Sequence, residues 1–153
     1  MAQGFYISWE IEGEKQLSRK LLLLSERVQD WTPAFKSSAI ELKNIFSKDV
    51  FKTQGSVIGE NWSPLSRAYA YQKAKKYPGK GLLEATGAMR NGFMTMWRPD
   101  MAMVWNDIEY FKYHQSNKPR NVLPRRVMMK LGLAQRTLVV KIFHAYFNKM
   151  VNS

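Results

Sequence analysis

The chain has 153 residues, of which 45% are hydrophobic and 13% aromatic, enough to fill the core of one domain and to argue against disorder throughout. It carries 24 lysines and arginines against 12 acids, and this net charge of +12 predicts attraction to polyanions or to acidic protein surfaces. Because cysteine is absent, a disulfide framework, a thiolate metal site and a cysteine nucleophile are all excluded.

The longest uninterrupted aliphatic run is Leu21 to Leu24, far short of the roughly 20 apolar residues that a membrane helix needs. The first ten residues also lack the charged-then-apolar order of a signal peptide. We therefore expect a soluble, non-secreted protein without a membrane partner.

The charge is distributed unevenly along the chain. Residues 1–60 hold 8 basic and 8 acidic residues, whereas residues 61–153 hold 16 and 4, so the second part accounts for the whole excess. We expect a single domain over 1–153, with a near-neutral helical part at 1–52 and a basic part at 61–153.

The near-neutral part begins with Phe5 to Ile11, where apolar residues alternate with polar ones as in a half-buried strand. Helical spacing then predicts one helix over Glu14 to Gln29 and a second over about Thr32 to Phe51, with Thr32 as its N-cap. A loop with two glycines and a proline follows at residues 53–64. The residues expected to face inward from the second helix are Phe35, Ala39, Leu42, Phe46 and Val50.

The basic part is predicted to begin with a helix over Pro64 to Lys76, which the turn at Tyr77 to Gly81 ends. A second short helix is expected over Leu82 to Asn91. Phe93 to Arg98 and Met101 to Asn106 flank the turn-forming pair Pro99-Asp100 and predict a β-hairpin.

The rest of the chain predicts a short helix over Asp107 to Gln115 with Asp107 as its N-cap, and then an extended loop over Ser116 to Pro124. A C-terminal helix is expected over Leu133 to Met150. Helices and a few strands that do not alternate regularly predict an α+β fold with N-terminal helices, a small antiparallel sheet or hairpin and a C-terminal helix. The residues expected to face inward from the last helix are Val139, Ile142, Phe143, Tyr146 and Met150.

The residues that could carry chemistry are few. His114 and His144 do not have the spacing of paired metal ligands, and the sequence lacks the GxSxG, P-loop and GxGxxG motifs. Asp107 and Glu109 could in principle form a general-base pair, but solvation of a helix start is the preferred interpretation. We therefore expect neither an enzyme nor a bound metal or cofactor.

Binding of nucleic acid without sequence preference is the alternative that the residues themselves support. Four lysines between residues 73 and 80 are interleaved with tyrosines, a combination that suits phosphates and stacked bases. A further basic group comprises Arg120, Arg125 and Arg126, while no helix-turn-helix, zinc finger or RNP-type signature is present.

Four short motifs in the basic part are more specific than composition. The run Gly59 to Ser66 (GENWSPLS), followed by Tyr69 and Lys73, resembles the G-x-x-W-x-P-L-S-x-x-(Y/T)-x-x-x-K signature of the phage virion morphogenesis family, the tail-completion proteins of the phage Mu G type. Three further stretches resemble, in order, that family's LxxTGxLRxS, YAxxHQxG and iPaRpflG stretches. They are Leu82 to Arg90, Tyr110 to Gln115 and Leu123 to Arg126, within a span of residues 55 to 150.

The resemblance implies a structural virion protein of a tailed bacteriophage, a neck component at the head-proximal end of the tail that enables head-tail joining. It also implies a ring of identical subunits, commonly six in related neck components. The neighbours would be a head-completion or stopper protein and a tail terminator or tail tube, with DNA passing through the ring. Such a protein would be assembled in the host cytoplasm and located in the virion neck.

The motifs have an architectural interpretation. Trp62 is either a lid on the core or an anchor between subunits, and these alternatives stay open on sequence. Ser66 can cap the following helix, and Gly87 suits a tight bend. We expect Tyr110, Tyr113 and His114 to pack the hairpin against the C-terminal helix.

A ring needs two different patches on each subunit. One is expected around Trp62 and the segment Lys73 to Lys80, and the other in the loop from Lys118 to Lys130. A basic surface that meets acidic neighbours is preferred to one that lines a DNA channel, because many phosphate contacts would hold the DNA. The free subunit is expected to be monomeric or weakly associated. The predicted interface residues are Trp62, Pro64, Leu65, Tyr69, Lys73, Lys75, Lys76, Lys80, His114, Arg120, Arg125 and Arg126.

Overall fold

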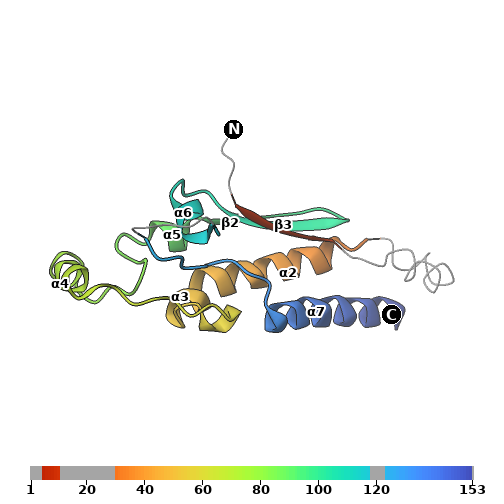
Figure 1. Cartoon of the computed structure of the whole chain (residues 1–153). Helices are drawn as coiled ribbons and strands as arrows, with labels where there is room; N and C mark the ends of the chain where they lie inside the picture. The colour runs from red at the N-terminus through yellow and green to blue at the C-terminus, as the bar shows by residue number, and fades with distance from the viewer. Residues whose placement is uncertain (1–4, 11–29, 118–122, 153) are drawn as a thin grey trace.

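The computed structural model describes residues 5–10, 30–117 and 123–152. It is a single small α+β domain, as predicted, in which a three-stranded antiparallel sheet, a long helix and a C-terminal helix form three layers (Figure 1). The predicted helix over Glu14 to Gln29 and the predicted site residue Arg120 lie outside the described residues.

The sheet has the strand order β1-β3-β2. Strands β2 (Phe93–Trp97) and β3 (Met101–Asn106) form the predicted hairpin around Pro99-Asp100, and β1 (Tyr6–Glu10) pairs with the other side of β3, with Tyr6 opposite Trp105. Because side chains alternate along a strand, one face of the sheet carries Ala102 and Val104, which are fully buried against the long helix.

The long helix runs without a break through α2 (Thr32–Asn44), a π-helical turn η1 (Ile45–Asp49) and α3 (Val50–Lys52). All five residues that the helical spacing placed on its inner face are completely buried. The predicted N-cap is wrong by one residue, because Trp31 occupies that position and the Asp30 carboxylate accepts a hydrogen bond from the Thr32 N–H at 2.9 Å. Hydrogen bonding to the side chain of Thr32, and then to its N–H, lowers the pKa of Asp30.

Helix α7 (Leu133–Val151) packs against the side of α2 that is turned away from the sheet (Figure 1). Its predicted inward residues lie on the packed side but remain half-buried. Phe143 stacks on Trp31 with ring centroids 5.7 Å apart and meets Phe35 edge-on at 4.9 Å. These contacts hold the C-terminal helix to the start of α2.

Between α3 and the hairpin the chain forms three short helices. They are η2 (Ser56–Ile58), inside the predicted loop, α4 (Arg67–Lys76) and α5 (Ala88–Asn91). The prediction of a helix from Leu82 onward is wrong, because Leu83 adopts a positive φ of 61° and the two leucines pack against the core as a loop. Gly87, at φ 78°, makes the predicted bend just before α5.

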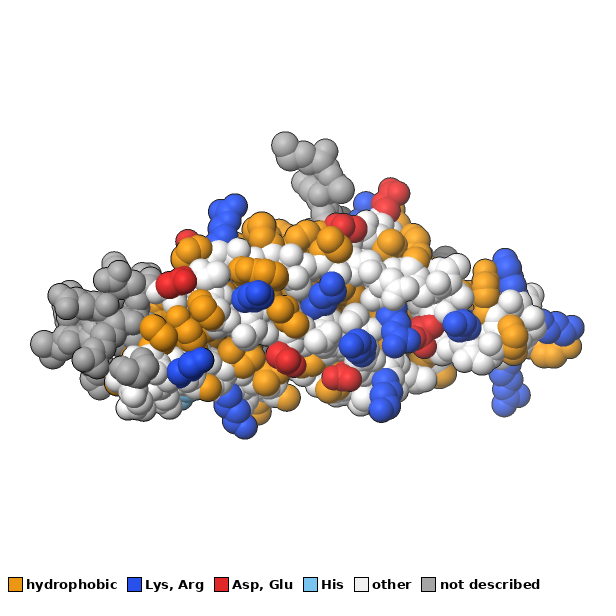
Figure 2. All heavy atoms as spheres, turned by 180° about the vertical axis from the view of Figure 1, so that it is seen from behind, with side chains coloured by type: hydrophobic (Ala, Val, Ile, Leu, Met, Phe, Trp, Pro, Cys, Tyr) orange, Lys and Arg blue, Asp and Glu red, His pale blue; other side chains and the backbone are white. Residues whose placement is uncertain are grey.

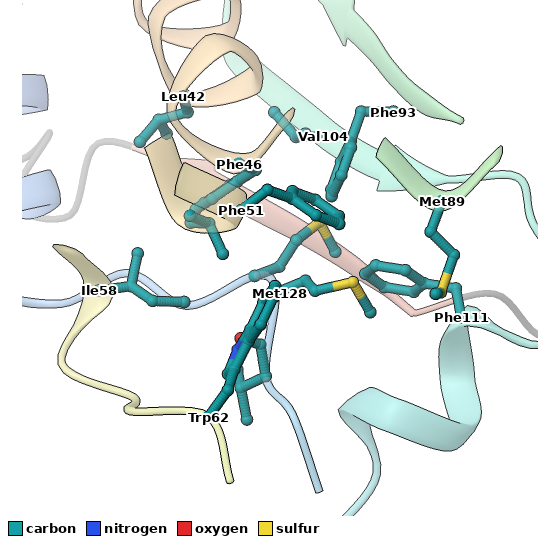
Figure 3. Packing of buried hydrophobic residues seen from close by; sticks show 13 residues of the cluster. Leu42, Phe46, Phe51, Ile58, Trp62, Met89, Phe93, Val104, Phe111 and Met128 are labelled. Atoms are coloured by element: carbon teal, nitrogen blue, oxygen red, sulfur yellow. The ribbon is translucent and has the colours of Figure 1, made fainter. Parts of the chain in front are cut away.

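After β3, the predicted short helix is α6 (Phe111–Gln115), which begins four residues later than expected. Asp107 does not cap it, since its carboxylate accepts a hydrogen bond from the indole N–H of Trp105. The main core lies where α3, the hairpin, α6 and the segment 127–129 meet, and Figure 3 shows its packing.

Candidate functional site: the motif junction and helix α4

Trp62, in the first motif, belongs to the core. Only 7% of its surface is exposed, its indole N–H donates to the Val127 carbonyl oxygen at 2.7 Å, and its ring meets Phe51 edge-on at 5.5 Å. Figure 3 shows it among the buried side chains. Gly55, at φ 86°, makes this possible, because a Cβ there would lie 2.7 Å from the indole and 1.8 Å from the Glu60 carbonyl oxygen. Of the two roles that the sequence left open, the structure supports the lid on the core.

Arg126, in the fourth motif, binds the backbone of the first. Its guanidinium donates to the carbonyl oxygens of Ser63 at 2.9 Å and Pro64 at 3.2 Å, and only 4% of the residue is exposed. Burial lowers its pKa. A guanidinium has several donors in a fixed plane, so a single side chain can satisfy two carbonyl groups of the WSP turn. Arg126 is therefore a structural cross-link within the subunit, and the interface role that the sequence predicted for it stays a prediction.

Gln115, in the third motif, fixes the strand-like segment after Arg126. Its Oε1 accepts from the N–H groups of Met128 at 2.9 Å and Met129 at 3.2 Å, and its Nε2 donates to the Met129 carbonyl oxygen. The Arg126 N–H also donates to the carbonyl oxygen of His114 at 3.1 Å. The amide of Gln115 thus satisfies backbone groups in a segment that has no neighbouring strand to bind them.

The second motif is tied to the helix and to the first motif. Arg90 forms an ion pair with Glu84 at 2.9 Å and donates through Nε to the Ser47 carbonyl oxygen at 3.1 Å, inside the π-helical turn. Lys73 donates through Nζ to the carbonyl oxygen of Gly81. Burial lowers the pKa of Lys73; Glu84 opposes this shift, and the positive charge of Arg126 adds to it.

The four motifs, far apart in sequence, therefore meet in one structural unit, which we call the motif junction. It is defined by Trp62, Lys73, Arg90, Gln115 and Arg126 with the backbone groups that they bind. Each side chain donates to a backbone carbonyl oxygen, in a loop or, for Arg90, in the π-helical turn, at a net benefit of about 0.5–1.5 kcal/mol per bond. The chemistry of this unit is architectural.

Helix α4 contrasts with the junction from which it emerges. Ser66 caps it, as predicted, by accepting from the Tyr69 N–H at 3.4 Å. Nine of its ten residues are exposed, and Lys73 is the exception. The helix projects from one end of the molecule (Figure 1). The side chain of Lys73, bound to the loop after the helix, holds α4 in this position.

The surface of α4 is basic and aromatic. Residues 61–83 contain five lysines and arginines and no acid. The ammonium groups of Lys75 and Lys76 lie 4.5 Å and 5.4 Å from the ring centres of Tyr71 and Tyr77, so cation–π contacts keep cations and rings side by side. Figure 2 shows the Lys and Arg side chains that surround this end. The arrangement suits a partner that offers both acids and apolar area.

The predicted interface residues therefore divide into two groups. Trp62, Lys73 and Arg126 are buried in the motif junction, and Leu65 and His114 are half-buried. The other described members are exposed. They are Pro64, Tyr69, Lys75, Lys76, Lys80 and Arg125.

The predicted packing role of α6 also needs correction. Tyr110 and Tyr113 are 45% and 48% exposed, whereas Phe111 is buried and meets Phe93 of the hairpin edge-on at 5.7 Å. Sequence reasoning missed Phe111 and Gln115. The third motif did contain a signal for Gln115. A glutamine amide has both donors and an acceptor, so it can bind the N–H and C=O groups of a segment that has no strand partner.

Two searches of the described residues complete the description of the surface. No group of three or more His, Cys, Asp or Glu side chains in these ranges is placed to hold a metal ion. No helix in them is long and apolar enough to cross a membrane. Comparisons with family models, curated proteins and solved structures give no match to this chain.

Proposed function

We propose that this chain is a tail-completion or neck component of a tailed bacteriophage. In this proposal it assembles as a ring, hexameric as in related neck components, at the head-proximal end of the tail and enables head-tail joining. The four motif resemblances suggest the role. The observation that carries it is that the motif residues interlock in one junction, which is what motifs that specify a shared subunit architecture would do.

The junction also supports a role in assembly rather than chemistry. Its motif side chains bind backbone carbonyls, and the surface that it presents is the exposed helix α4 with its lysines and tyrosines. The neighbours that fit this surface carry acids on an apolar background. Acidic faces of a stopper, a tail terminator or a tail-tube subunit fit that description, and DNA would pass through the ring.

Electron microscopy of lysates tests the proposal. A phage from which this reading frame has been deleted should yield DNA-filled heads beside separate tails, and supplying the intact chain in trans should restore virions. Intact virions from the deletion phage would refute the joining role. Empty heads only, or no tails, would also contradict it, because those products place the defect before joining.

Sequence-independent binding of nucleic acid is the second candidate, and the exposed alternation of cations and tyrosines on α4 favours it. Fluorescence polarisation with labelled single- and double-stranded DNA at physiological salt separates the two. Binding whose affinity falls steeply with salt would support this candidate, since each phosphate contact releases counterions. Weak binding together with self-assembly would support the structural role.

A further inference from the structure

The outer face of the sheet is unusually apolar. Antiparallel sheets that cover a core on one face commonly present polar residues on the other. Here Met94 is 43% exposed and Tyr6 is 60% exposed, and in the described ranges the sheet packs on α2 through its opposite face. Hydrophobic side chains gather along the upper edge of Figure 2, where the sheet lies. By strand alternation and register, the described side chains on this face are Tyr6, Ser8, Met94, Met96, Met101, Met103 and Trp105, and Ser8 is the polar one among them.

Acidic side chains accompany this face. Asp107 lies at its rim, since its carboxylate accepts from the indole N–H of Trp105. The segment 93–110 holds three acids and one arginine in a chain whose net charge is +12. Its acids Asp100 and Glu109 are exposed, as Asp107 is. The outer sheet face is therefore apolar with an acidic border.

Helix α4 has the complementary properties. Its charged side chains are all cations, and Tyr69 and Tyr71 are 54% and 64% exposed. Methionine side chains adapt to irregular partners and make favourable contacts between sulfur and aromatic rings. We propose that α4 of one copy docks on the outer sheet face of a second copy, with its tyrosines on the methionines and its lysines towards Asp107 and Glu109.

This pairing joins two different surfaces, so the contact is heterologous and the pair keeps one free donor helix and one free acceptor face. Repetition of the contact closes a ring or extends a filament. It would supply the subunit contact of the ring proposed above, but it rests on the two surfaces and not on the phage role.

Light scattering after size-exclusion chromatography tests the pairing with two variants. Lys75→Glu/Lys76→Glu reverses the charge on α4, and Met94→Lys places a cation on the acceptor face; each should weaken self-association by about tenfold or more. Mixed in equal amounts, the two variants should form one heterodimer and nothing larger, because one supplies an intact face and the other an intact helix.

Matched controls are available on α7. Val140 is 53% exposed, so Val140→Lys tests an apolar-to-lysine change away from the sheet, and Lys141→Glu/Lys149→Glu tests charge reversal away from α4. Both should assemble as the unmodified chain does. Circular dichroism establishes that each variant is folded. A monomeric unmodified chain at concentrations on the order of 1 mM, or assembly unaffected by both test variants, would overturn the proposal.

Disulfide trapping gives a second, independent readout because the chain contains no cysteine. The double variant Tyr71→Cys/Met94→Cys should produce a ladder of covalent oligomers on oxidation, whereas either single variant should form no covalent oligomer. A covalent dimer from Tyr71→Cys alone would indicate a symmetric contact between two α4 helices and contradict the pairing. Oxidation of the double variant without a ladder would contradict it as well.

The outcomes separate this proposal from the proposed function. A chain that self-associates through these surfaces but is dispensable for head-tail joining would refute the phage role and leave the pairing intact. A chain that is essential for joining, but whose self-association is unchanged by both test substitutions, would support the phage role and refute the pairing.

Discussion

The motif junction and helix α4 are adjacent in sequence, and the first motif contributes to both, yet their side chains have opposite environments. In the junction, Trp62 and Arg126 are buried and bind backbone carbonyls across more than sixty residues of sequence. In α4, every residue except Lys73 is exposed. A motif can therefore mark the scaffold that presents a surface, while most of that surface, Tyr69 apart, lies at positions between the motif residues.

The largest effect is expected at the centre of the junction. Trp62→Ala removes a buried indole and leaves the Val127 carbonyl without its donor, so the free energy of unfolding should fall by about 3–5 kcal/mol. Trp62→Phe keeps an aromatic ring in this place and should lower the free energy of unfolding by less. Urea denaturation followed by circular dichroism measures both, and a loss below about 1 kcal/mol for alanine would place Trp62 outside the core.

Arg125 and Arg126 give an internal comparison between neighbours of the same chemistry. Arg126→Met preserves the aliphatic stem but leaves the Ser63 and Pro64 carbonyls unpaired, which should cost about 2–3 kcal/mol. Arg125 is exposed, so Arg125→Met should change stability by less than about 0.5 kcal/mol. If the two variants lost equal amounts of unfolding free energy, burial would not be what distinguishes Arg126 from Arg125.

Lys73 links the motif junction to α4, and its contribution to the free energy of unfolding depends on pH. Lys73→Met removes the bond to Gly81 and should cost about 1 kcal/mol near neutral pH. Because burial lowers the pKa of Lys73 in the folded chain, the unfolded chain binds more protons between the lowered and the ordinary pKa. The stability that the unmodified chain has over Lys73→Met should therefore increase as the pH rises through that range. Thermal unfolding of both proteins at several alkaline pH values checks the sign, and a falling difference would contradict it.

The smallest effect on stability is expected on α4. Lys75→Glu/Lys76→Glu changes two exposed residues, so the free energy of unfolding should shift by less than about 0.5 kcal/mol. Chemical denaturation beside Lys141→Glu/Lys149→Glu provides the comparison. A shift of more than about 1.5 kcal/mol would show that the charges of α4 support the fold.

Much of the fold could be predicted because local sequence patterns determine it. The five residues that the helical spacing placed on the inner face of the long helix are all buried, although the spacing missed Ser38, and Pro99-Asp100 located the hairpin. The predictions that Asp107 caps a helix and that a helix starts at Leu82 were wrong, because side-chain contacts that helical spacing does not encode decided both outcomes. Asp107 binds the indole of Trp105, and Leu83 takes a positive φ while packing on the core.

The candidate site was harder to predict for the same reason. Lysine and arginine are normally exposed, so Lys73 and Arg126 were expected on a surface with Lys75 and Arg125. Only the folded chain brings the Gly81, Ser63 and Pro64 carbonyls within reach of these two cations. Alternation along β3 separates Met103 and Trp105 from Ala102 and Val104, but only the packing of Ala102 and Val104 on α2 shows that the other two residues lie on the outer face of the sheet.

The central claim is that the motif junction holds α4 as an assembly surface for head-tail joining. Its most direct test is electron microscopy of deletion-phage lysates supplied with Lys75→Glu/Lys76→Glu or with Lys141→Glu/Lys149→Glu. We expect filled heads beside separate tails with the α4 variant and intact virions with the α7 control. Intact virions in both lysates would contradict the claim.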